Sequence, residues 1–395
     1  MFYVCLRLIL PKNFDVMENQ LNYIRPFHDS EVNAAMNQIL DNENFLMFLK
    51  RFIYEKEDID AEVVLLRKID TVLKFQDKIS QKFVQKIIDR TVQNFKITHF
   101  ESIDKNKGYL YVTNHRDIVL DSALLQLSLF NQGFKTAQSA IGNNLVLSDL
   151  LLNIAKLNKM FLVIRDGSVR ELIENSNVLS SYISSSISQN NSVWIAQRNG
   201  RTKDGIDLTQ QGLLKMLTLW GEGSILDKIY NLNIIPAAVS YEYESCDFLK
   251  ARELVISENG KYEKRSGEDL LSIETGLTQF KGDVNIVFGE PLNDSYEEWK
   301  KLTGNDNEVL KYFATLLDAS ILKNYILYPS NFIAADLILN SSKFKTHYTD
   351  EQKEKFLAYC QKNIDKSDVD KERFKEKFLS IYANPVFQKE KLELL

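Results

Sequence analysis

The sequence predicts an α/β fold in which a mostly parallel sheet is flanked by helices, with a further helical region at each end of the chain. Between residues 97 and 292, five short runs rich in β-branched and aromatic residues alternate with helical patterns. Strands that alternate with helices are joined by crossovers into a buried, largely parallel sheet. Before and after this segment, apolar residues recur at helical spacing. We therefore expect a helical region at 17–94, an α/β domain at 95–295 and a second helical region at 296–395.

The composition is that of an ordinary globular protein. The 395 residues are 44% apolar and 26% charged, with a net charge of −5. A nucleic-acid-binding protein is expected to carry a basic surplus, so we expect no nucleic-acid partner. The cysteines Cys5, Cys246 and Cys360 form neither a metal-binding spacing nor a disulfide framework. A reducing compartment is the default expectation.

The N-terminal region combines a short apolar start with amphipathic helices. The run MFYVCLRLIL is too short to cross a bilayer and lacks the cleavage pattern of a signal peptide. A second methionine, Met17, opens a more polar stretch, and we expect residues 1–16 to lie outside the folded protein. Further on, helix faces are formed by two sets of apolar residues: Val32, Met36 and Ile39, and then Ile79, Phe83 and Ile87.

Five strands are predicted in the middle of the chain, at 109–113, 160–164, 193–196, 234–241 and 284–288. Polar clusters follow the first three of them: NHRD, RDG and QRNGRTKDG. Ligands of parallel sheets bind outside the carboxyl ends of the strands, so these clusters form the candidate site. After the second strand, Ser168 and Glu171 form a capping box that predicts the start of a helix.

The C-terminal region is predicted to be helical, with periodic apolar residues in EVLKYFATLLDASIL and SNFIAADLIL. Its last 45 residues are rich in lysine, glutamate and aromatic residues. A solvated helical cap is the simpler interpretation of this tail, and a specific interaction surface is the alternative.

The cluster NHRDIVLD contains the first letters of a protein-kinase catalytic loop, but the surrounding sequence excludes a kinase. Ser122 stands where the kinase motif has its metal-binding asparagine, and D-F-G, A-P-E and the glycine-rich loop are missing. No G-x-S-x-G elbow indicates an α/β-hydrolase. The four histidines, at positions 28, 99, 115 and 347, are not clustered as metal ligands, so we expect no metal site.

His115 and a carboxylate close behind it can act together as a general base. A neutral imidazole near pH 7 can take a proton from a hydroxyl, and a neighbouring carboxylate fixes its tautomer and stabilises the imidazolium. With an incoming alcohol, this pair suffices for acyl transfer without a covalent enzyme intermediate. The simpler alternative is a loop histidine that makes ordinary hydrogen bonds.

Five blocks in order resemble the glycerolipid acyltransferases, the glycerol-3-phosphate and lysophosphatidate acyltransferase family. That family has an H-x4-D block after a strand, an apolar strand that ends in a basic residue, an E-G-x-R block and an apolar block with a proline. A late strand closes the domain. The corresponding segments here are NHRDIVLD (114–121), MFLVIRDG (160–167), WIAQRNGRTKDG (194–205), IIPAAVSYE (234–242) and VFGEPL (287–292). The resemblance covers about residues 95–295.

The resemblance implies a role for each block. His115 would be the general base that deprotonates the acceptor hydroxyl, and a carboxylate would orient it. Arginine suits an anionic acceptor because its planar guanidinium pairs bidentately with phosphate, although a surface salt bridge is the simpler role. The anion would be held by Arg165, and by Arg201 with Arg198 or Lys203. The other candidates for substrate binding are Asn114, Arg116, Asn199, Gly200 and Pro236, the last of which would line the acyl pocket or shape its strand.

Two features depart from the family pattern. Five residues rather than four separate His115 from Asp121. This spacing predicts a one-residue expansion with Asp121 as the partner of the histidine, and Asp117 is the alternative. The glutamate of the third block is missing, and the nearest candidates, Gln197 and Asn199, are neutral. The missing charge bears on the identity of the acceptor more than on acyl transfer itself.

From this resemblance we expect an O-acyltransferase of phospholipid biosynthesis, cytoplasmic and peripheral on the inner face of the cell membrane. It would move a fatty acyl group from acyl-CoA or acyl carrier protein to a hydroxyl of glycerol 3-phosphate or a lysophospholipid, without a cofactor. Membrane contact would come from an amphipathic or apolar surface. Two alternatives stay open: acylation of a non-phosphate lyso-lipid, and a non-catalytic relative that binds lipid or acyl carrier protein.

Overall fold

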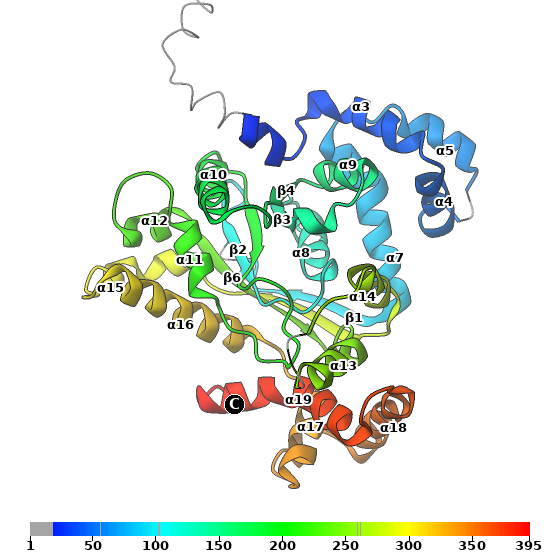
Figure 1. The fold of residues 1–395 in the computed structure, drawn as a ribbon, viewed down its shortest axis with the longest axis vertical. Coiled ribbons are helices and arrows are strands. Elements are labelled where there is room, and N and C mark those ends of the chain that lie inside the picture. Colours follow the sequence, from blue (N-terminus) through cyan, green and yellow to red (C-terminus); the bar gives the residue numbers. More distant parts are fainter. Residues whose placement is uncertain (1–18, 56, 102, 259, 261) are drawn as a thin grey trace, which may run out of the picture.

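The protein has an α/β fold in which a mostly parallel sheet of seven strands is flanked by helices (Figure 1). The structure, a computed structural model, describes residues 19–55, 57–101, 103–258, 260 and 262–395. The prediction for residues 1–16 falls outside these residues. None of the described helices combines the length and the hydrophobicity that a membrane crossing needs.

The strands lie in the order β1-β7-β6-β2-β5-β3-β4, so β2 is the middle strand. All neighbouring pairs are parallel except β6 and β7, which are antiparallel. The strand bounds are β1 (Val92–Thr98), β2 (Leu110–Thr113), β3 (Gln138–Gly142), β4 (Met160–Val163), β5 (Val193–Ala196), β6 (Ile234–Tyr241) and β7 (Gly282–Phe288).

The five predicted strands are all confirmed, whereas β1 and β3 were not predicted. β1 lies at the edge of the sheet, and its residues alternate between exposed and half-buried, so it has no continuous apolar run. The prediction instead continued the preceding helix to about residue 94. β3 has the sequence QSAIG, in which Ile141 is the only β-branched residue.

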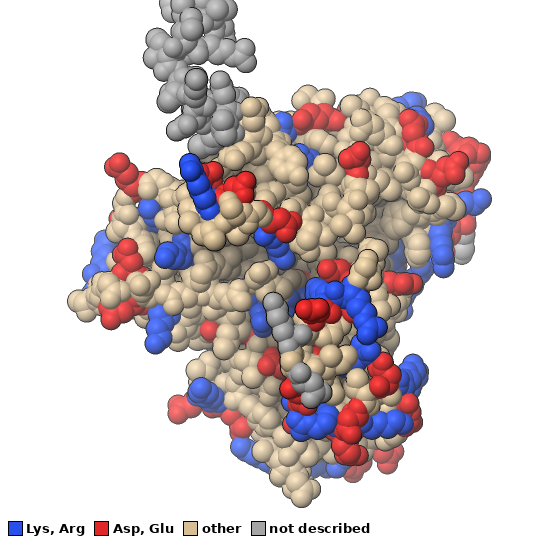
Figure 2. All heavy atoms as spheres, viewed as in Figure 1, with Lys and Arg blue, Asp and Glu red and all other residues tan. Residues whose placement is uncertain are grey.

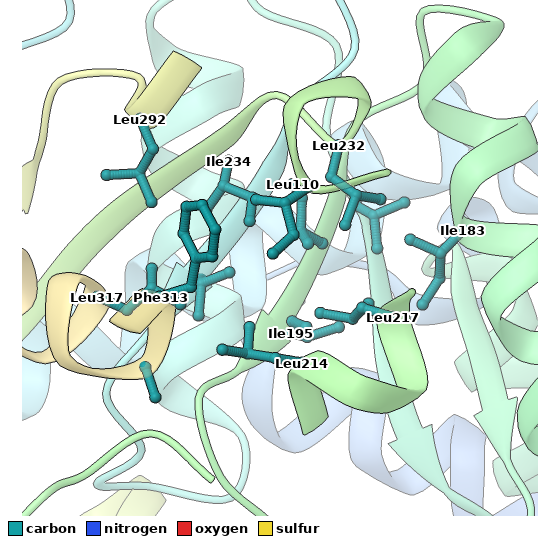
Figure 3. Packing of buried hydrophobic residues seen from close by; sticks show 14 of the residues in the cluster. Leu110, Ile183, Ile195, Leu214, Leu217, Leu232, Ile234, Leu292, Phe313 and Leu317 are labelled. Atoms are coloured by element: carbon teal, nitrogen blue, oxygen red, sulfur yellow. The ribbon is translucent and has the colours of Figure 1, made fainter. Parts of the chain in front are cut away.

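β2 is buried on both faces because its alternate side chains enter two different cores. Leu110 and Val112 join a cluster with the helices α10 (Val169–Ser188), α11 (Gln211–Leu217), α12 (Ile225–Asn231) and α16 (Asp306–Asn324), part of which is shown in Figure 3. Tyr111 packs on the opposite face, which is covered by α7 (Gln81–Thr91) and α8 (Leu120–Asn131). The loop that follows β2 is thereby anchored at the centre of the molecule.

The N-terminal helices form a separate apolar cluster at one end of the sheet (Figure 1). The predicted face of Val32, Met36 and Ile39 is buried there, and Leu157 of α9 (Asp149–Leu157) joins it. These helices are α3 (Asp29–Leu40), α4 (Glu43–Phe52), α5 (Ile59–Leu66), α6 (Val72–Phe75) and the π-helical turn Gln76–Ser80, which continues into α7.

The remaining elements are helices and single turns that join the strands to one another or to the C-terminal helices. The predicted capping box of Ser168 and Glu171 is confirmed at the start of α10. The other connections are α13 (Asp247–Ser257), α14 (Glu268–Thr278), α15 (Tyr296–Trp299) and the 3₁₀ turns Asn143–Leu145, Leu292–Ser295 and Lys345–His347.

The C-terminal helices pack on one another and on α13, below the sheet in Figure 1. They are α17 (Pro329–Leu339), α18 (Asp350–Lys366) and α19 (Lys371–Lys391). Phe356, Phe378 and Tyr382 are buried in their shared core. On the outside, lysine and arginine alternate with aspartate and glutamate, and Figure 2 shows both signs mixed over this lower part of the molecule.

Candidate functional site

A cavity of about 1110 Å³ lies along the carboxyl ends of the neighbouring parallel strands β2, β5, β3 and β4. Each strand end contributes to its wall: His115 after β2, Arg198 after β5, Gly142 in β3 and Arg165 after β4. This is the edge at which parallel sheets bind their ligands. The volume is slightly above the roughly 300–1000 Å³ of typical small-molecule sites.

Much of the cavity wall is apolar, and several different helices supply it. α4 of the N-terminal region reaches the cavity together with α7, α9 and α10. The apolar lining includes Phe45, Phe48, Phe83, Val84, Ile87, Leu150, Ile154, Leu179 and Ile183. A flexible hydrocarbon chain would be removed from water against such a surface.

His115 lies in the loop after β2, with its side chain 14% exposed. Its Nδ1 atom is 3.0 Å from Oδ2 of Asp121. The ring packs edge-on against Trp194, whose own Nε1–H donates to Thr113. Because the carboxylate accepts a hydrogen bond from Nδ1–H, Nε2 keeps a free lone pair. None of the described residues hydrogen-bonds Nε2, and His115 lines the cavity.

Asp121 is fully buried in the first turn of α8, and four donors hold its carboxylate. Besides the His115 ring, Oδ2 accepts the backbone N–H groups of Arg116 at 2.6 Å and Asp117 at 2.9 Å. The hydroxyl of Tyr241 donates to Oδ1 at 2.9 Å. Burial and the neighbouring Asp121 carboxylate raise the pKa of Tyr241, so this hydroxyl stays a donor. The carboxylate cannot turn without breaking several of these bonds.

Asp117 faces away from the histidine and serves the helix instead. Its Oδ1 accepts the backbone N–H groups of Val119 and Leu120, both at 2.8 Å, at the start of α8. Its Oδ2 accepts a hydrogen bond from the hydroxyl of Ser245. The structure therefore places Asp121, and not Asp117, beside the His115 ring.

Two residues of the predicted site, one just after β2 and one within β6, lie away from the cavity wall. The side chain of Asn114 extends the pairing of β2 with β6, because its amide exchanges hydrogen bonds with the backbone N–H and C=O of Val239, at 2.8 and 2.9 Å. Pro236 is buried within β6 opposite Val112, and its carbonyl accepts the N–H of Gly289. Pro236 shapes its strand, which was one of its two predicted roles.

Arg116 points into the protein, where other residues surround its guanidinium. Nη2 donates to the Gly205 carbonyl at 3.2 Å, and Nη1 donates to Glu244 at 3.4 Å. Nε lies 3.4 Å from the Asp207 carboxylate, and the ring of Tyr325 packs against the guanidinium. Burial opposes the charge, but Tyr325 and the carboxylates of Glu244, Asp207 and Asp121 outweigh it and raise the pKa of Arg116.

Arg201 is buried nearly as deeply but has no such partners. It is 8% exposed, and its Nη1 atom is completely buried. Across the described ranges, no hydrogen bond or ion pair reaches its guanidinium, and Arg201 lines the cavity. The next residue, Thr202, donates its N–H to the His115 carbonyl at 2.9 Å, which holds the Arg201 loop against the histidine. A buried cation without a partner is costly, so this site is suited to a bound anion.

The other predicted binding residues also line the cavity, and they differ in how many bonds their side chains already make to the protein. Among the described residues, the exposed Arg165 is held only through its backbone N–H, which donates to Asn143. Arg198 donates to the Ile206 carbonyl, and Lys203 pairs with Glu253. Asn199 and Gly200 are exposed at the turn between them. Of the cations in this loop, Arg201 is thus the least engaged with the protein.

Sequence reasoning missed several residues that hold the site together. Asp207, in the loop after β5, accepts the backbone N–H of His115 at 3.0 Å. Burial raises the pKa of this carboxyl, and the guanidinium of Arg116 opposes that shift. Tyr241, at the end of a predicted strand, could have been found from its position. Glu244 and Lys250 carry no sequence signal, because their role depends on how loops after three strands meet.

The arrangement supplies three chemical functions in one cavity. His115 can accept a proton at Nε2, and Asp121 can stabilise the resulting imidazolium. Arg201 can hold an anion, and the apolar wall can hold a hydrocarbon chain. Within the described residues, no group of three or more histidine, cysteine, aspartate or glutamate side chains is arranged to hold a metal ion.

No family model matches the sequence, and no curated protein matches it. Among solved structures, the fold has a slight similarity to the crystal structure of the 1-acyl-sn-glycerophosphate (LPA) acyltransferase PlsC from Thermotoga maritima. The two share 13% sequence identity at a TM-score of 0.35, over 74% of this chain and 95% of that one. A likeness of this size establishes neither a family nor a substrate.

Proposed function

We propose that the protein is an acyltransferase that moves a fatty acyl group from a thioester, acyl-CoA or acyl carrier protein, to the hydroxyl of an anionic acceptor. Glycerol 3-phosphate or a lysophospholipid would be such an acceptor. The observation that carries the proposal is the His115–Asp121 pair, which lines the same cavity as the unpartnered guanidinium of Arg201.

The chemistry follows from the free lone pair of His115. Nε2 takes the proton of the acceptor hydroxyl while the hydroxyl oxygen attacks the thioester carbonyl carbon. The C–S bond then breaks, and the imidazolium returns its proton to the leaving thiolate. Asp121 stabilises the imidazolium between these steps, held in place by Tyr241 and two backbone N–H groups. The reaction forms an ester and a free thiol and needs no cofactor.

The charge on the cavity wall supports an anionic acceptor. Arg201 is the primary ligand in this proposal, because its hydrogen-bonding groups are not engaged by the described residues. Arg198 and Arg165 lie on the same wall and would add long-range attraction. Lys203 contributes less because it already pairs with Glu253. A phosphate offers the bidentate geometry that a guanidinium prefers.

A peripheral location on the inner face of the cell membrane is part of the proposal. Large apolar side chains are exposed near the cavity, on and before the first turns of α9 and α10: Leu147, Leu151, Val169 and Ile173. Such side chains can enter the interface of a bilayer, from which a lipid acceptor would reach the cavity.

The direct test is acyl transfer by purified protein with labelled acyl-CoA and labelled acyl carrier protein, offered against a pool of lipid acceptors. His115→Ala should lower the rate by about 10²–10⁴-fold, the usual contribution of a general base. His347→Ala is the matched control, because His347 is exposed in the C-terminal region, where its ring lies against Phe332 and Phe344. Equal rates in the wild type and His115→Ala would contradict the proposal.

The same experiment separates the alternatives. If the wild type transfers acyl groups to a lyso-lipid that lacks phosphate and ignores glycerol 3-phosphate, the enzyme class stands and the acceptor changes. If the wild type binds the acyl thioester but transfers nothing to any acceptor, the protein is a binding relative of the enzymes.

A further inference from the structure

Four buried charges join the loops that follow three neighbouring strands. Arg116 comes from the loop after β2, Asp207 from the loop after β5, and Glu244 from the turn after β6. Lys250, on α13, pairs with Glu244 at 2.6 Å and is 1% exposed. Two positive and two negative charges thus form a neutral cluster in which every side chain is almost completely buried.

This cluster holds the backbone on which the histidine sits. Residues 114–117 have no regular secondary structure, so no helix or strand ladder fixes their conformation. The His115 N–H donates to Asp207, and the Arg116 carbonyl accepts a hydrogen bond from Nζ of Lys250 at 2.7 Å. On the other side, the Arg116 N–H donates to Asp121. The backbone around His115 is therefore fixed at three points by side chains of other elements.

Stability does not explain such a cluster. Removing charges from water costs several kcal/mol per ion, and well-packed apolar residues often replace a buried ion pair without loss of stability. An apolar residue at position 250 would, however, leave the Arg116 carbonyl without its donor. Lys250 links the cluster to this backbone, because its ammonium divides its bonds between a side chain, Glu244, and the carbonyl next to His115.

We propose that Lys250 is a positioning residue for His115. Its hydrogen bond to the Arg116 carbonyl keeps the histidine ring aligned with Asp121 and with the cavity, and Glu244 keeps the ammonium in place. The inference rests on the proposed acyl transfer and deepens it. It assigns an ordering role to a lysine that lies outside every sequence motif of the site and does not line the cavity.

The test separates this bond from charge balance. Lys250→Met removes the bond to the carbonyl and leaves Glu244 without its closest cation, so both activity and stability should fall. The double variant Glu244→Gln/Lys250→Met removes one charge of each sign, which should restore most of the melting temperature. If the bond is what matters, kcat of the double variant stays at least tenfold below wild type while KM for donor and acceptor changes less than about twofold.

Lys228→Met is the matched control. Lys228 also donates to two backbone carbonyls, those of Thr218 and Gly221, but it does so at α12. Its kcat should equal that of the wild type. Recovery of wild-type kcat in the double variant, together with the melting temperature, would overturn the proposal, because charge balance alone would then explain the effect.

A second measurement does not depend on turnover. The side-chain ¹⁵N resonances of the histidines report the hydrogen bond of each ring, and the spectrum of His115→Ala assigns the signal of His115. That signal should move in Lys250→Met and in the double variant and stay in place in Lys228→Met. An unchanged His115 signal in the double variant overturns the positioning role, even if the protein has no transferase activity. If the signal moves in the double variant but the wild type transfers no acyl group, the positioning role stands and only the proposed function is contradicted.

Discussion

The loop after β2 and the loop after β5 each bury an arginine, and the protein treats the two side chains in opposite ways. Arg116 is surrounded by Asp207, Glu244, a carbonyl and an aromatic ring. Arg201 is buried nearly as deeply, yet no described residue pairs with its guanidinium. Both stand in polar clusters that follow a predicted strand, and the sequence motifs alone do not distinguish them.

The contrast shows how to interpret a buried cation. A buried charge persists only where something compensates for its lost hydration. For Arg116 the compensation comes from within the fold, so its role is to join loops. For Arg201 no described residue supplies the compensation, which is why we propose that it binds an anionic substrate. The predictions that follow test this difference, beginning with the largest expected effect.

Removing Arg116 should strongly destabilise the fold. Arg116→Met leaves Asp207 and Glu244 in the interior with only Lys250 to balance them, and breaking a buried pair in this way costs about 3–5 kcal/mol. Urea unfolding measures the change. Arg252→Met is the control, because Arg252 forms an exposed pair with Asp368 and should contribute less than about 1 kcal/mol. Similar unfolding midpoints for the two variants would show that Arg116 is not structural.

Gly205, whose carbonyl accepts from Arg116, should tolerate no side chain. Its φ is +83°, and a Cβ atom there would lie 2.2 Å from the Ile381 carbonyl of α19. Gly205→Ala combines this clash with the strain of the left-handed conformation, so we expect a loss of about 1–3 kcal/mol.

Gly200 provides the comparison for Gly205. It also has a positive φ, +76°, but a Cβ atom would meet nothing within 4 Å. Gly200→Ala should cost only the backbone strain of about 1–2 kcal/mol. If the two variants unfold at the same urea concentration, the close contact between Gly205 and the Ile381 carbonyl of α19 does not contribute to stability.

Unlike Arg116→Met, Arg201→Met should weaken substrate binding and leave the stability of the fold intact. Because no internal partner is lost, the unfolding midpoint should stay the same or rise slightly. The KM for a phosphate-bearing acceptor should rise about 10- to 150-fold, which corresponds to the loss of one charge-assisted hydrogen bond of about 1.5–3 kcal/mol. A neutral acceptor should be unaffected. A large loss of stability with an unchanged KM would reverse the assignment of the two arginines.

Lys281 is a third kind of buried cation, one whose charged form is disfavoured by burial. Burial lowers its pKa from 10.5 to about 8, and its Nζ donates to the Gln279 carbonyl. A lowered pKa means that stability present above pH 10.5 is lost as the pH falls through 8. Between these values the unfolding free energy should fall by up to about 1.4 kcal/mol per pH unit. Lys281→Met should remove this share of the slope, and identical slopes in both proteins would show that Lys281 stays charged.

The fold was predictable where burial is continuous. β6 is buried along its whole length, so its sequence is a nearly continuous apolar run that predicts a strand. The edge strand β1 is half-exposed and has no such run. The choice of Asp121 over Asp117 followed from the family spacing, and the structure agrees because Asp117 is needed at the start of α8.

The residues that contact the site side chains from other loops could not be predicted from the sequence. Arg116 was among the candidates for substrate binding, but its side chain leaves the loop toward Asp207 and Glu244, residues 91 and 128 positions away. Such contacts depend on how the loops after β2, β5 and β6 meet. No pattern within one loop encodes them.

The most direct test of the account is the release of free thiol from an acyl thioester, measured in purified wild type and His115→Asn with and without an acceptor hydroxyl. The account predicts release in the wild type that depends on the acceptor, and a rate about 10²–10⁴-fold lower in His115→Asn. Release that is equally fast in both proteins, or that does not depend on the acceptor, would contradict the role of His115 as the base of acyl transfer.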